Sequence, residues 1–448
     1  MQHQVFGRVR AAFWLGPVVL LCSGIGGWAL PSLATVERGE PLCAARSFVA
    51  RTASAGAAFF RQVRASGAPV QTVPGMPPVP DPNNLYSETA AGELNPAVAA
   101  DLPRVYVPNR RSNNVHVIDP KTLSVVDRFP VGISPQHVVP SWDLKTLWVA
   151  NNGGAVRLAL AGPHLRTLWP GHSGSGLTNG SLTPIDPKTG KPGEAIPVDD
   201  PYNLYFTPDG HSAIVVAEKR KRLDFRDPQT MALQQSISAP GCSGINHADF
   251  SIDGRYAIFT CEFRGGGLVK IDLVHHQVLG YLHFPKRGMP QDIRISPDGA
   301  RFYVADMHAD GVYVVDGDAF AVIDFIPTGV GTHGLYPSRD AKELYVANRG
   351  SHSTRGAPHG KGSIAVIDFA TGKIEHTWPI PGGGSPDMGN VSADGKQLWL
   401  SGRFDNVVYD IDTSTGAVKS IPVGMEPHGL TVWPQPGRYS LGHTGNMR

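Results

Sequence analysis

From Arg104 onward, short apolar runs alternate with polar turns at a regular interval. Each unit holds one run, such as VYVPN or LYVAN, that ends in a small or polar residue, and a second run that closes on an aspartate. Turns such as TPDG, SIDG, SPDG and SADG come before the first of these runs, where Asp caps the turn and Gly tolerates positive φ. The closing residues are Asp119, Asp186, Asp227, Asp272, Asp316, Asp368 and Asp412.

The spacing of these aspartates predicts the fold. Four of the six gaps measure 41 to 45 residues, and the other two, of 67 and 52, carry insertions. Four short antiparallel strands in about 42 residues are typical of a propeller blade. We therefore predict an all-β domain over 102–448, a seven-bladed β-propeller of four-stranded antiparallel blades.

The first blade lacks its own first strand, because the unit at 103–132 begins at its second strand. The stretch PHGLTVWP at 427–434 is a spare first strand near the C-terminus. We expect this C-terminal strand to complete the first blade, which would remove a free sheet edge. Residues 438–443 have no place in this scheme.

The strand sequences VYVPN and LYVAN resemble the YVTN β-propeller repeat family over about 104–434. The run from Pro74 to the terminal GRYSLGHTGNMR is similar to exported bacterial proteins of this family with no assigned reaction. The resemblance implies a propeller that is often exported or at the cell surface. It implies little about activity, because the superfamily includes binding modules, lactonases, and domains that carry copper or haem.

The N-terminus has the features of an export signal. Arg8 and Arg10 precede an uncharged apolar stretch at 11–30, and Ser32-Leu33-Ala34 offers small residues for cleavage. Residues 1–34 are thus a predicted signal peptide, or else an uncleaved membrane anchor. Residues 35–101, rich in Pro, Ala and Gly, are a predicted linker, either flexible or laid along a surface. We expect an extracytoplasmic location: periplasmic, cell-surface or secreted.

Composition excludes some partners. The chain carries a formal net charge of +2 and 17% charged residues, with no basic stripe interleaved with aromatic residues, so we expect no nucleic-acid partner. A membrane would be contacted only through an uncleaved N-terminal segment. We expect a monomer whose partner is a small molecule or a protein.

One polar position recurs at the start of each first strand and should lie around the mouth of the central channel. Four of its seven residues are histidines, and converging imidazoles and carboxylates suit a transition metal such as copper, zinc or iron. Alternatively, these side chains hydrogen-bond the backbone of the neighbouring blade. The position is occupied by His137, Asn203, His247, Asp292, His333, Asp387 and His428, all but Asn203 being candidate metal ligands.

Charged residues follow the ends of the second strands on the same face, which we call the upper face. Arg110, Arg349 and Arg403 could bind a carboxylate or phosphate over the channel, or form a solvated rim. Two insertions fall between second and third strands there, at 153–180 with His164 and His172, and at 351–362 with His352 and His359. The predicted ligand-binding rim comprises Arg110, Glu218, Arg220, Asp306, His308, Arg349 and Arg403.

Two of the four cysteines, Cys242 and Cys261, flank one hairpin, and folding it brings them near each other. In an oxidising compartment they could form a disulfide. The alternatives are two free thiols, or Cys261 as a soft metal ligand beside His247.

No serine-nucleophile elbow, dinucleotide-binding loop or haem-attachment motif stands out. The leading hypothesis is a ligand- or partner-binding scaffold that uses its upper face and channel mouth. The alternative is a metal-dependent (copper, zinc or iron) oxidoreductase or hydrolase that uses the ring histidines.

Overall fold

The computed structural model describes residues 69–154, 180–354 and 361–448. The predicted signal peptide, the first part of the linker, most of the first insertion with His164 and His172, and His359 of the second lie outside the described residues. Within those residues, no helix is both long and apolar enough to cross a membrane. Two short 3-10 helices, η1 (Ser87–Thr89) and η2 (Pro96–Val98), precede the first strand.

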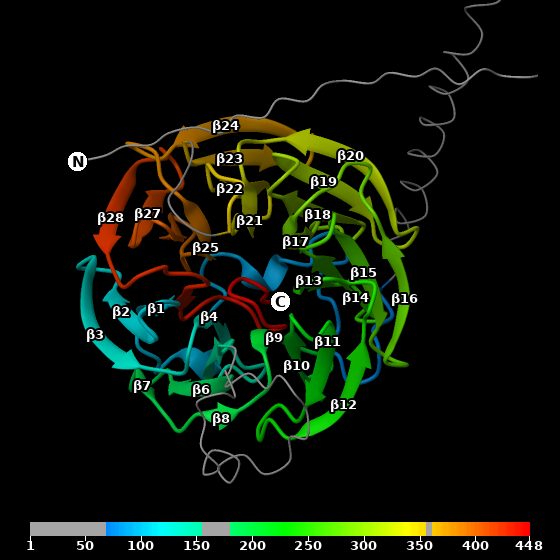
Figure 1. Cartoon of the computed structure of the whole chain (residues 1–448), viewed down its shortest axis with the longest axis horizontal. Helices are drawn as coiled ribbons and strands as arrows, with labels where there is room; N and C mark the ends of the chain where they lie inside the picture. The colour runs from blue at the N-terminus through cyan, green and yellow to red at the C-terminus, as the bar shows by residue number, and fades with distance from the viewer. Residues whose placement is uncertain (1–68, 155–179, 355–360) are drawn as a thin grey trace, which may run out of the picture. The chain divides into compact units, whose positions relative to one another are not determined.

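Seven antiparallel sheets stand around a central axis as the blades of a propeller, which confirms the predicted fold (Figure 1). From the axis outward, blade 1 contains β29 (Thr431–Trp433), β1 (Arg104–Asn109), β2 (Asn114–Asp119) and β3 (Ser124–Pro130); blade 2 contains β4 (Pro135–Pro140), β5 (Leu147–Asn151) and β6 (Ser181–Asp186), with β7 (Lys191–Pro192) and β8 (Ile196–Pro197) sharing its outer edge; and blade 3 contains β9 (Pro201–Phe206), β10 (Ala213–Ala217), β11 (Arg222–Arg226) and β12 (Leu233–Ser238).

The other four blades follow in chain order. Blade 4 contains β13 (Ile245–Phe250), β14 (Tyr256–Cys261), β15 (Gly267–Asp272) and β16 (Gln277–Leu282); blade 5 contains β17 (Pro290–Ile295), β18 (Arg301–Asp306), β19 (Gly311–Asp316) and β20 (Ala321–Pro327); blade 6 contains β21 (Thr332–Pro337), β22 (Glu343–Asn348), β23 (Ser363–Asp368) and β24 (Lys373–Pro379); and blade 7 contains β25 (Pro386–Val391), β26 (Gln397–Gly402), β27 (Val407–Asp412) and β28 (Val418–Pro422).

The ring closes in blade 1, where the C-terminal β29 pairs antiparallel with the N-terminal β1. Val105 lies opposite Val432, and Arg104 lies opposite Trp433. This pairing is the predicted completion of the first blade. It leaves β1 with a hydrogen-bonded neighbour on each side, so no inner sheet edge is left open there.

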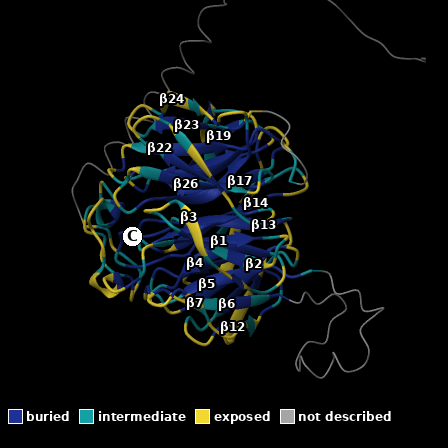
Figure 2. Cartoon of the chain, turned by 90° about the vertical axis from the view of Figure 1, so that its left-hand side faces the viewer, coloured by how far each residue is buried: buried dark blue, intermediate teal, exposed yellow. Residues whose placement is uncertain are grey.

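Burial follows the distance from the axis. Every residue of the innermost strands β4, β9, β13, β17 and β25 is buried, whereas the outermost β16 alternates exposed and half-buried positions. In Figure 2 the outer strand β3 is likewise largely exposed. An inner strand contacts neighbouring blades on both faces, so even its polar residues are buried, whereas an outer strand faces water on one side. Among the described residues, a separate apolar core fills each of the seven interfaces between neighbouring blades.

Side chains of the inner strands also join neighbouring blades by hydrogen bonds. Asp249 Oδ2 accepts the backbone N–H of Ile295 at 2.9 Å, and Asn390 Oδ1 accepts that of Val432 at 2.8 Å. Buried amides of inner strands would otherwise lack a partner, at a cost of about 1–3 kcal/mol each. These polar residues therefore hold the blades in register around the axis.

The chain after β29 enters the centre of the ring, where Figure 1 shows the C-terminus. Residues 435–448 run along the far ends of the inner strands, which define the lower face. The Phe206 N–H donates to the Leu441 carbonyl at 2.7 Å, and Arg448 donates to the carbonyl of Phe250 at 2.6 Å. This C-terminal plug contains residues 438–443, which the repeat pattern could not place.

The segment before β1 lies across the same lower face. The Val73 N–H donates to Asp253 O at 2.9 Å, and the Tyr86 hydroxyl donates to Ile295 O at 2.7 Å. Asn95 also donates to the carbonyl of Arg438 in the plug at 3.0 Å. Residues from 69 onward thus pack on the propeller and help to hold the plug.

Leu441 tests the contribution of the plug to stability. It is fully buried in the core between blades 3 and 4, so Leu441→Ala should lower the free energy of unfolding by about 2–5 kcal/mol. Leu233, which is 56% exposed on β12, provides the control, and its change to Ala should have little effect. Chemical denaturation of both variants measures the difference; equal stabilities would show that the plug does not contribute.

Cys242 and Cys261 are joined by a disulfide in the structure, with their Cα atoms 5.0 Å apart and a sequence separation of 19. Closing a loop of this length should stabilise the fold by about 3 kcal/mol. We expect the double variant Cys242→Ser, Cys261→Ser to melt at a lower temperature than the wild type. Mass spectrometry of alkylated, unreduced protein provides a direct check, since labelling of these two cysteines would contradict the bond.

Candidate functional site at the centre of the ring

The recurring polar position forms a ring of buried side chains around the axis, the inner ring. None of its members is more than 1% exposed. Six of them come from the starts of the innermost strands of blades 2 to 7, and His428 comes from the turn before β29. The inner ring consists of His137, Asn203, His247, Asp292, His333, Asp387 and His428.

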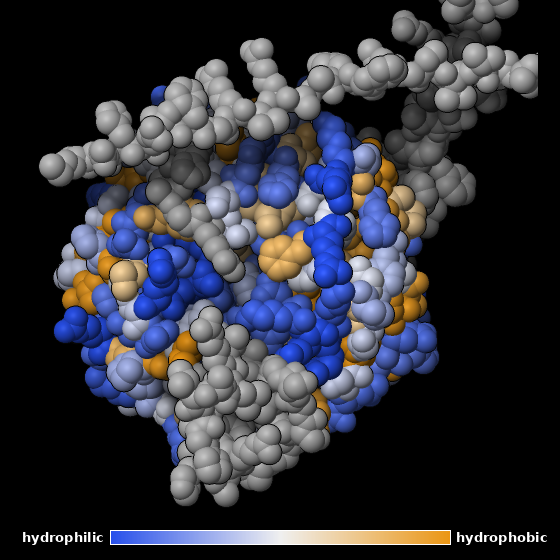
Figure 3. Space-filling model, in the orientation of Figure 1, coloured by the Kyte–Doolittle hydropathy of each residue, from blue (hydrophilic) through white to orange (hydrophobic). Residues whose placement is uncertain are grey.

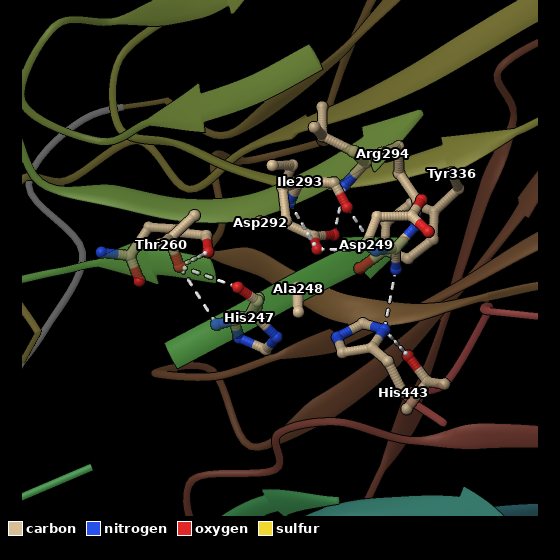
Figure 4. A network of polar contacts seen from close by, with 12 residues as sticks. His247, Ala248, Asp249, Thr260, Asp292, Ile293, Arg294, Tyr336 and His443 are labelled. Carbon is tan, nitrogen blue, oxygen red and sulfur yellow. Dashed lines mark hydrogen bonds and ion pairs between the residues drawn. The ribbon is translucent and has the colours of Figure 1, made fainter. Parts of the chain in front are cut away.

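Some members of the inner ring bind the neighbouring blade, as the structural interpretation predicted. Asp292 Oδ2 accepts the Leu335 N–H at 2.9 Å, and Arg294 Nη1 contacts Asp292 Oδ1 at 3.0 Å (Figure 4). His428 Nδ1 lies 3.1 Å from the carbonyl oxygen of Gln136. A carbonyl can only accept, so His428 must carry its proton on Nδ1 and a lone pair on Nε2.

The histidines meet more closely than a wide channel would allow. The ring centroid of His137 lies 4.7 Å from that of His428 and 5.1 Å from that of His247. Both nitrogens of His137 are buried without a hydrogen-bond partner among the described residues. The close packing needs Gly429, because a Cβ there would lie 2.0 Å from His137 Nδ1.

A fifth histidine reaches this cluster from the C-terminal plug. His443 lies 4.7 Å from His247 between ring centroids, and its Nδ1 accepts from Arg294 Nη2 at 2.7 Å (Figure 4). Sequence reasoning missed His443 because it lies outside the repeat. The only available signal was the HTG run in a tail that had no strand to belong to.

Burial controls the ionisation of these imidazoles. Burial lowers the pKa of His137 to about 3 and, together with Arg349, lowers that of His333 to about 4. Burial also lowers the pKa values of His247, His428 and His443 well below the usual value. At neutral pH the cluster is therefore uncharged, and neutral imidazole is the form that binds metals.

A second set of polar residues lies at the upper face, where each second strand has just ended. Hydrophilic residues gather around the centre of this face in Figure 3. Arginines occupy the position in blades 6, 7 and 1, and glutamates occupy it in blades 3 and 4. This upper ring consists of Arg110, Asn152, Glu218, Glu262, Met307, Arg349 and Arg403.

The arginines of the upper ring meet the inner ring at Asp387. Arg349 Nη2 lies 2.8 Å from Asp387 Oδ1, and Arg403 Nη1 lies 3.3 Å from Asp387 Oδ2. Arg110 pairs with Glu426 at 2.8 Å. Burial would raise the pKa of Asp387, but Arg349 and the nearby histidines lower it well below its usual value. Asp387 is thus a buried carboxylate anion.

In the acidic half of the upper ring, Glu218 and Glu262 have raised pKa values, in contrast to the lowered pKa of Asp387. Burial and the neighbouring Glu262 carboxylate raise the pKa of Glu218 well above its usual value, and burial also raises that of Glu262. The side-chain nitrogen of Asn246 donates to Glu262 at 3.0 Å. Two buried carboxyl groups in contact cannot both ionise readily, so at neutral pH this pair retains a proton.

The other predicted rim residues lie apart from the axis or bind the protein itself. Arg220 pairs with Asp199 at 3.0 Å, and His308 is exposed. Asp306 Oδ1 accepts backbone N–H groups of its own loop, including that of His308 at 3.0 Å. Met307, one residue later, holds the upper-ring position in blade 5.

Five of the six predicted metal ligands, all but His137, fall into two buried groups, in each of which the possible ligand atoms lie within 4.8 Å of one another. The first joins His247 and Asp292 to His443. It is filled by Arg294, which contacts both Asp292 and His443. The second, formed by His333, Asp387 and His428, contains the lone pair on His428 Nε2, which has no hydrogen-bond partner among the described residues.

The fold and its two rings define a seven-bladed β-propeller with a polar, histidine-rich centre. The profile of the YNCE-like beta-propeller family matches residues 182–436. The chain belongs to this family, in agreement with the resemblance of its strands to YVTN-type repeats. No curated protein matches its sequence significantly.

Several solved structures share the architecture at low identity. A proposed 6-phosphogluconolactonase from Bacteroides uniformis is 16% identical, with a TM-score of 0.55 over 74% of this chain and 99% of that one. Hydrazine synthase of Kuenenia stuttgartiensis is also 16% identical, with a TM-score of 0.50 over 73% and 94%. A dihydro-heme d1 dehydrogenase is also 16% identical, with a TM-score of 0.50 over 74% of this chain and 75% of that one. These likenesses concern the fold alone.

Replacing Asp387 tests the charge balance at the centre. Asp387→Asn would leave Arg349 and Arg403 buried without their anion, so the free energy of unfolding should fall by about 3–5 kcal/mol. Asp127, in an exposed pair with Lys191 at 2.7 Å, gives the matched control, because an exposed pair contributes little. Denaturant unfolding of Asp387→Asn and Asp127→Asn should differ clearly; similar curves would rule out a stabilising role for Asp387.

Proposed function

We propose that this protein is an extracytoplasmic binding module that takes a small polar ligand at the upper end of its axis, between the two halves of the upper ring. The ligand class is a small carboxylate with a hydrogen-bond donor, such as an amino or hydroxyl group, at its other end. The metal-dependent oxidoreductase or hydrolase is the second candidate, and the histidine cluster favours it.

The observation that carries the proposal is a set of unused hydrogen-bond donors on three adjacent blades. The Nε atoms of Arg110, Arg349 and Arg403 are buried without a partner among the described residues. A buried donor without a partner costs about 1–3 kcal/mol. Carboxylate oxygens of a ligand would satisfy these donors, and guanidinium groups suit them in geometry and charge.

The opposite half of the upper ring supplies the second feature of the ligand. Glu218 and Glu262 are 7% and 6% exposed and together retain a proton. Their oxygens can accept from an amino or hydroxyl group, which would also relieve the repulsion between the two carboxyl groups. A ligand with one acidic and one donor end therefore fits the polarity of the ring in a single orientation.

Two further points support the assignment of class and location. The structural neighbours bear the names of a synthase, a lactonase and a dehydrogenase, so the fold alone selects no reaction, and only the residues of the site can indicate one. The Cys242–Cys261 disulfide is of the kind that persists in oxidising compartments, which supports a location outside the cytoplasm.

Thermal melting in the presence of EDTA tests the ligand proposal without interference from metals. Amino acids, hydroxy acids and dicarboxylates would be screened, and at one hundred times its Kd a true ligand should stabilise the protein by about 2.7 kcal/mol. Arg403→Met should weaken the binding of that ligand at least about tenfold, whereas Arg128→Met, at an exposed site on β3, should leave its binding unchanged. The absence of any shift, or equal shifts in both variants, would overturn the proposal.

A further inference from the structure

We propose that His333, Asp387 and His428 form a binding site for one divalent first-row transition-metal ion. The three side chains come from blades 6, 7 and 1, which are neighbours around the axis. All three are buried, and their ligand atoms lie within 4.8 Å of one another. Two imidazoles and one carboxylate suit iron(II) and related ions and leave coordination positions open.

The orientation of His428 provides the strongest evidence. Its Nδ1 donates to the Gln136 carbonyl at 3.1 Å, which fixes the ring and places the lone pair on Nε2. That nitrogen lies 3.8 Å from Asp387 Oδ2. A lone pair and a carboxylate oxygen repel each other unless a cation or a hydrogen-bond donor lies between them. Histidines that bind metals typically donate their other N–H to a carbonyl or carboxylate, as His428 does.

His333 approaches the same carboxylate from the other side. Its Nδ1 lies 2.8 Å from Asp387 Oδ1, within ion-pair distance, but without the alignment of a regular N–H hydrogen bond. Short distance without hydrogen-bond alignment suits two ligands of one ion better than a donor and its acceptor. His137, 4.7 Å from His428 between ring centroids and with both nitrogens unpartnered, is available as a further ligand.

The arginines that contact Asp387 are compatible with this assignment. Arg349 approaches Oδ1 and Arg403 approaches Oδ2. Each carboxylate oxygen has two lone pairs, so one on each oxygen stays available to an ion. The arginines would then act as outer donors that orient the carboxylate, a common arrangement around protein metal sites.

The second buried group, which contains His247, provides an internal comparison. There Asp292 accepts from Arg294 and from two backbone N–H groups, and His443 Nδ1 also accepts from Arg294. The His247 Nδ1 lies 3.2 Å from the side-chain nitrogen of Asn203. Because Nδ1 of His247 and of His443 accepts from a protein donor, each neutral ring carries its proton on Nε2, which is buried without a partner among the described residues. Neither ring therefore offers a free lone pair, and we expect no ion in this group.

Metal binding by the full chain, purified without a histidine tag, tests the site. Protein stripped with a chelator would be dialysed against iron(II), manganese(II), cobalt(II), copper(II) or zinc(II), passed through a desalting column and analysed by elemental mass spectrometry. We expect close to one ion per chain for at least one metal. Cobalt(II) would also report nitrogen and oxygen ligands through its visible absorption, a readout independent of any activity.

Variants with matched controls locate the ion. His333→Gln and His428→Gln should each weaken binding at least about tenfold and alter the cobalt spectrum, whereas His247→Gln should bind as the wild type does. Near-UV circular dichroism would confirm that each variant is folded. Failure of every metal to remain bound, or equal binding by His428→Gln and His247→Gln, would overturn the proposal. Neither result would affect the ligand test, which is carried out in EDTA.

Discussion

Closure of the ring is the constraint on which the rest of this structure depends. Each blade buries both faces against its neighbours, and each of the seven interfaces has its own apolar core among the described residues. An open ring would expose two of these faces at once, together with the inner edge of β1. The pairing of Val105 with Val432 prevents this, and the three residues of β29 therefore matter far more than their number suggests.

The repeat arithmetic could predict the number of blades, the order of their strands and the C-terminal closure. It could do so because period, turn chemistry and strand alternation are local properties that recur seven times, and an incomplete first unit needs a complement elsewhere. The plug could not be predicted in this way. Leu441 and Arg448 are buried only because the lower end of the axis is open to them, and a segment that occurs once leaves no periodic signal.

The site was predictable in position but not in detail. Equivalent positions in a repeat lie at the same distance from the axis, so the sequence could predict which residues form the inner ring, from His137 to His428. Which members would meet depended on side-chain direction and on single-residue offsets. Blade 5 illustrates the point: Asp306 looked like the rim residue, but its carboxylate binds its own loop and Met307 follows at the ring. The place of His443 in the cluster could not be predicted without the three-dimensional course of the C-terminal plug.

The pairing of β1 with β29, which forms the seam of the ring, has a consequence for folding. Arg110 stands near the beginning of the propeller, and its ion-pair partner Glu426 stands near the end, in the turn before β29. His428, in the same turn, lies beside Asp387 of blade 7. A ligand that contacts Arg110 on one side of this seam and Arg349 or Arg403 on the other would bind the closed state and not an open one. By mass action it would shift the equilibrium toward closure. Occupancy of the site would then stabilise the closed ring, so that the propeller opens more often when the site is empty than when it is filled.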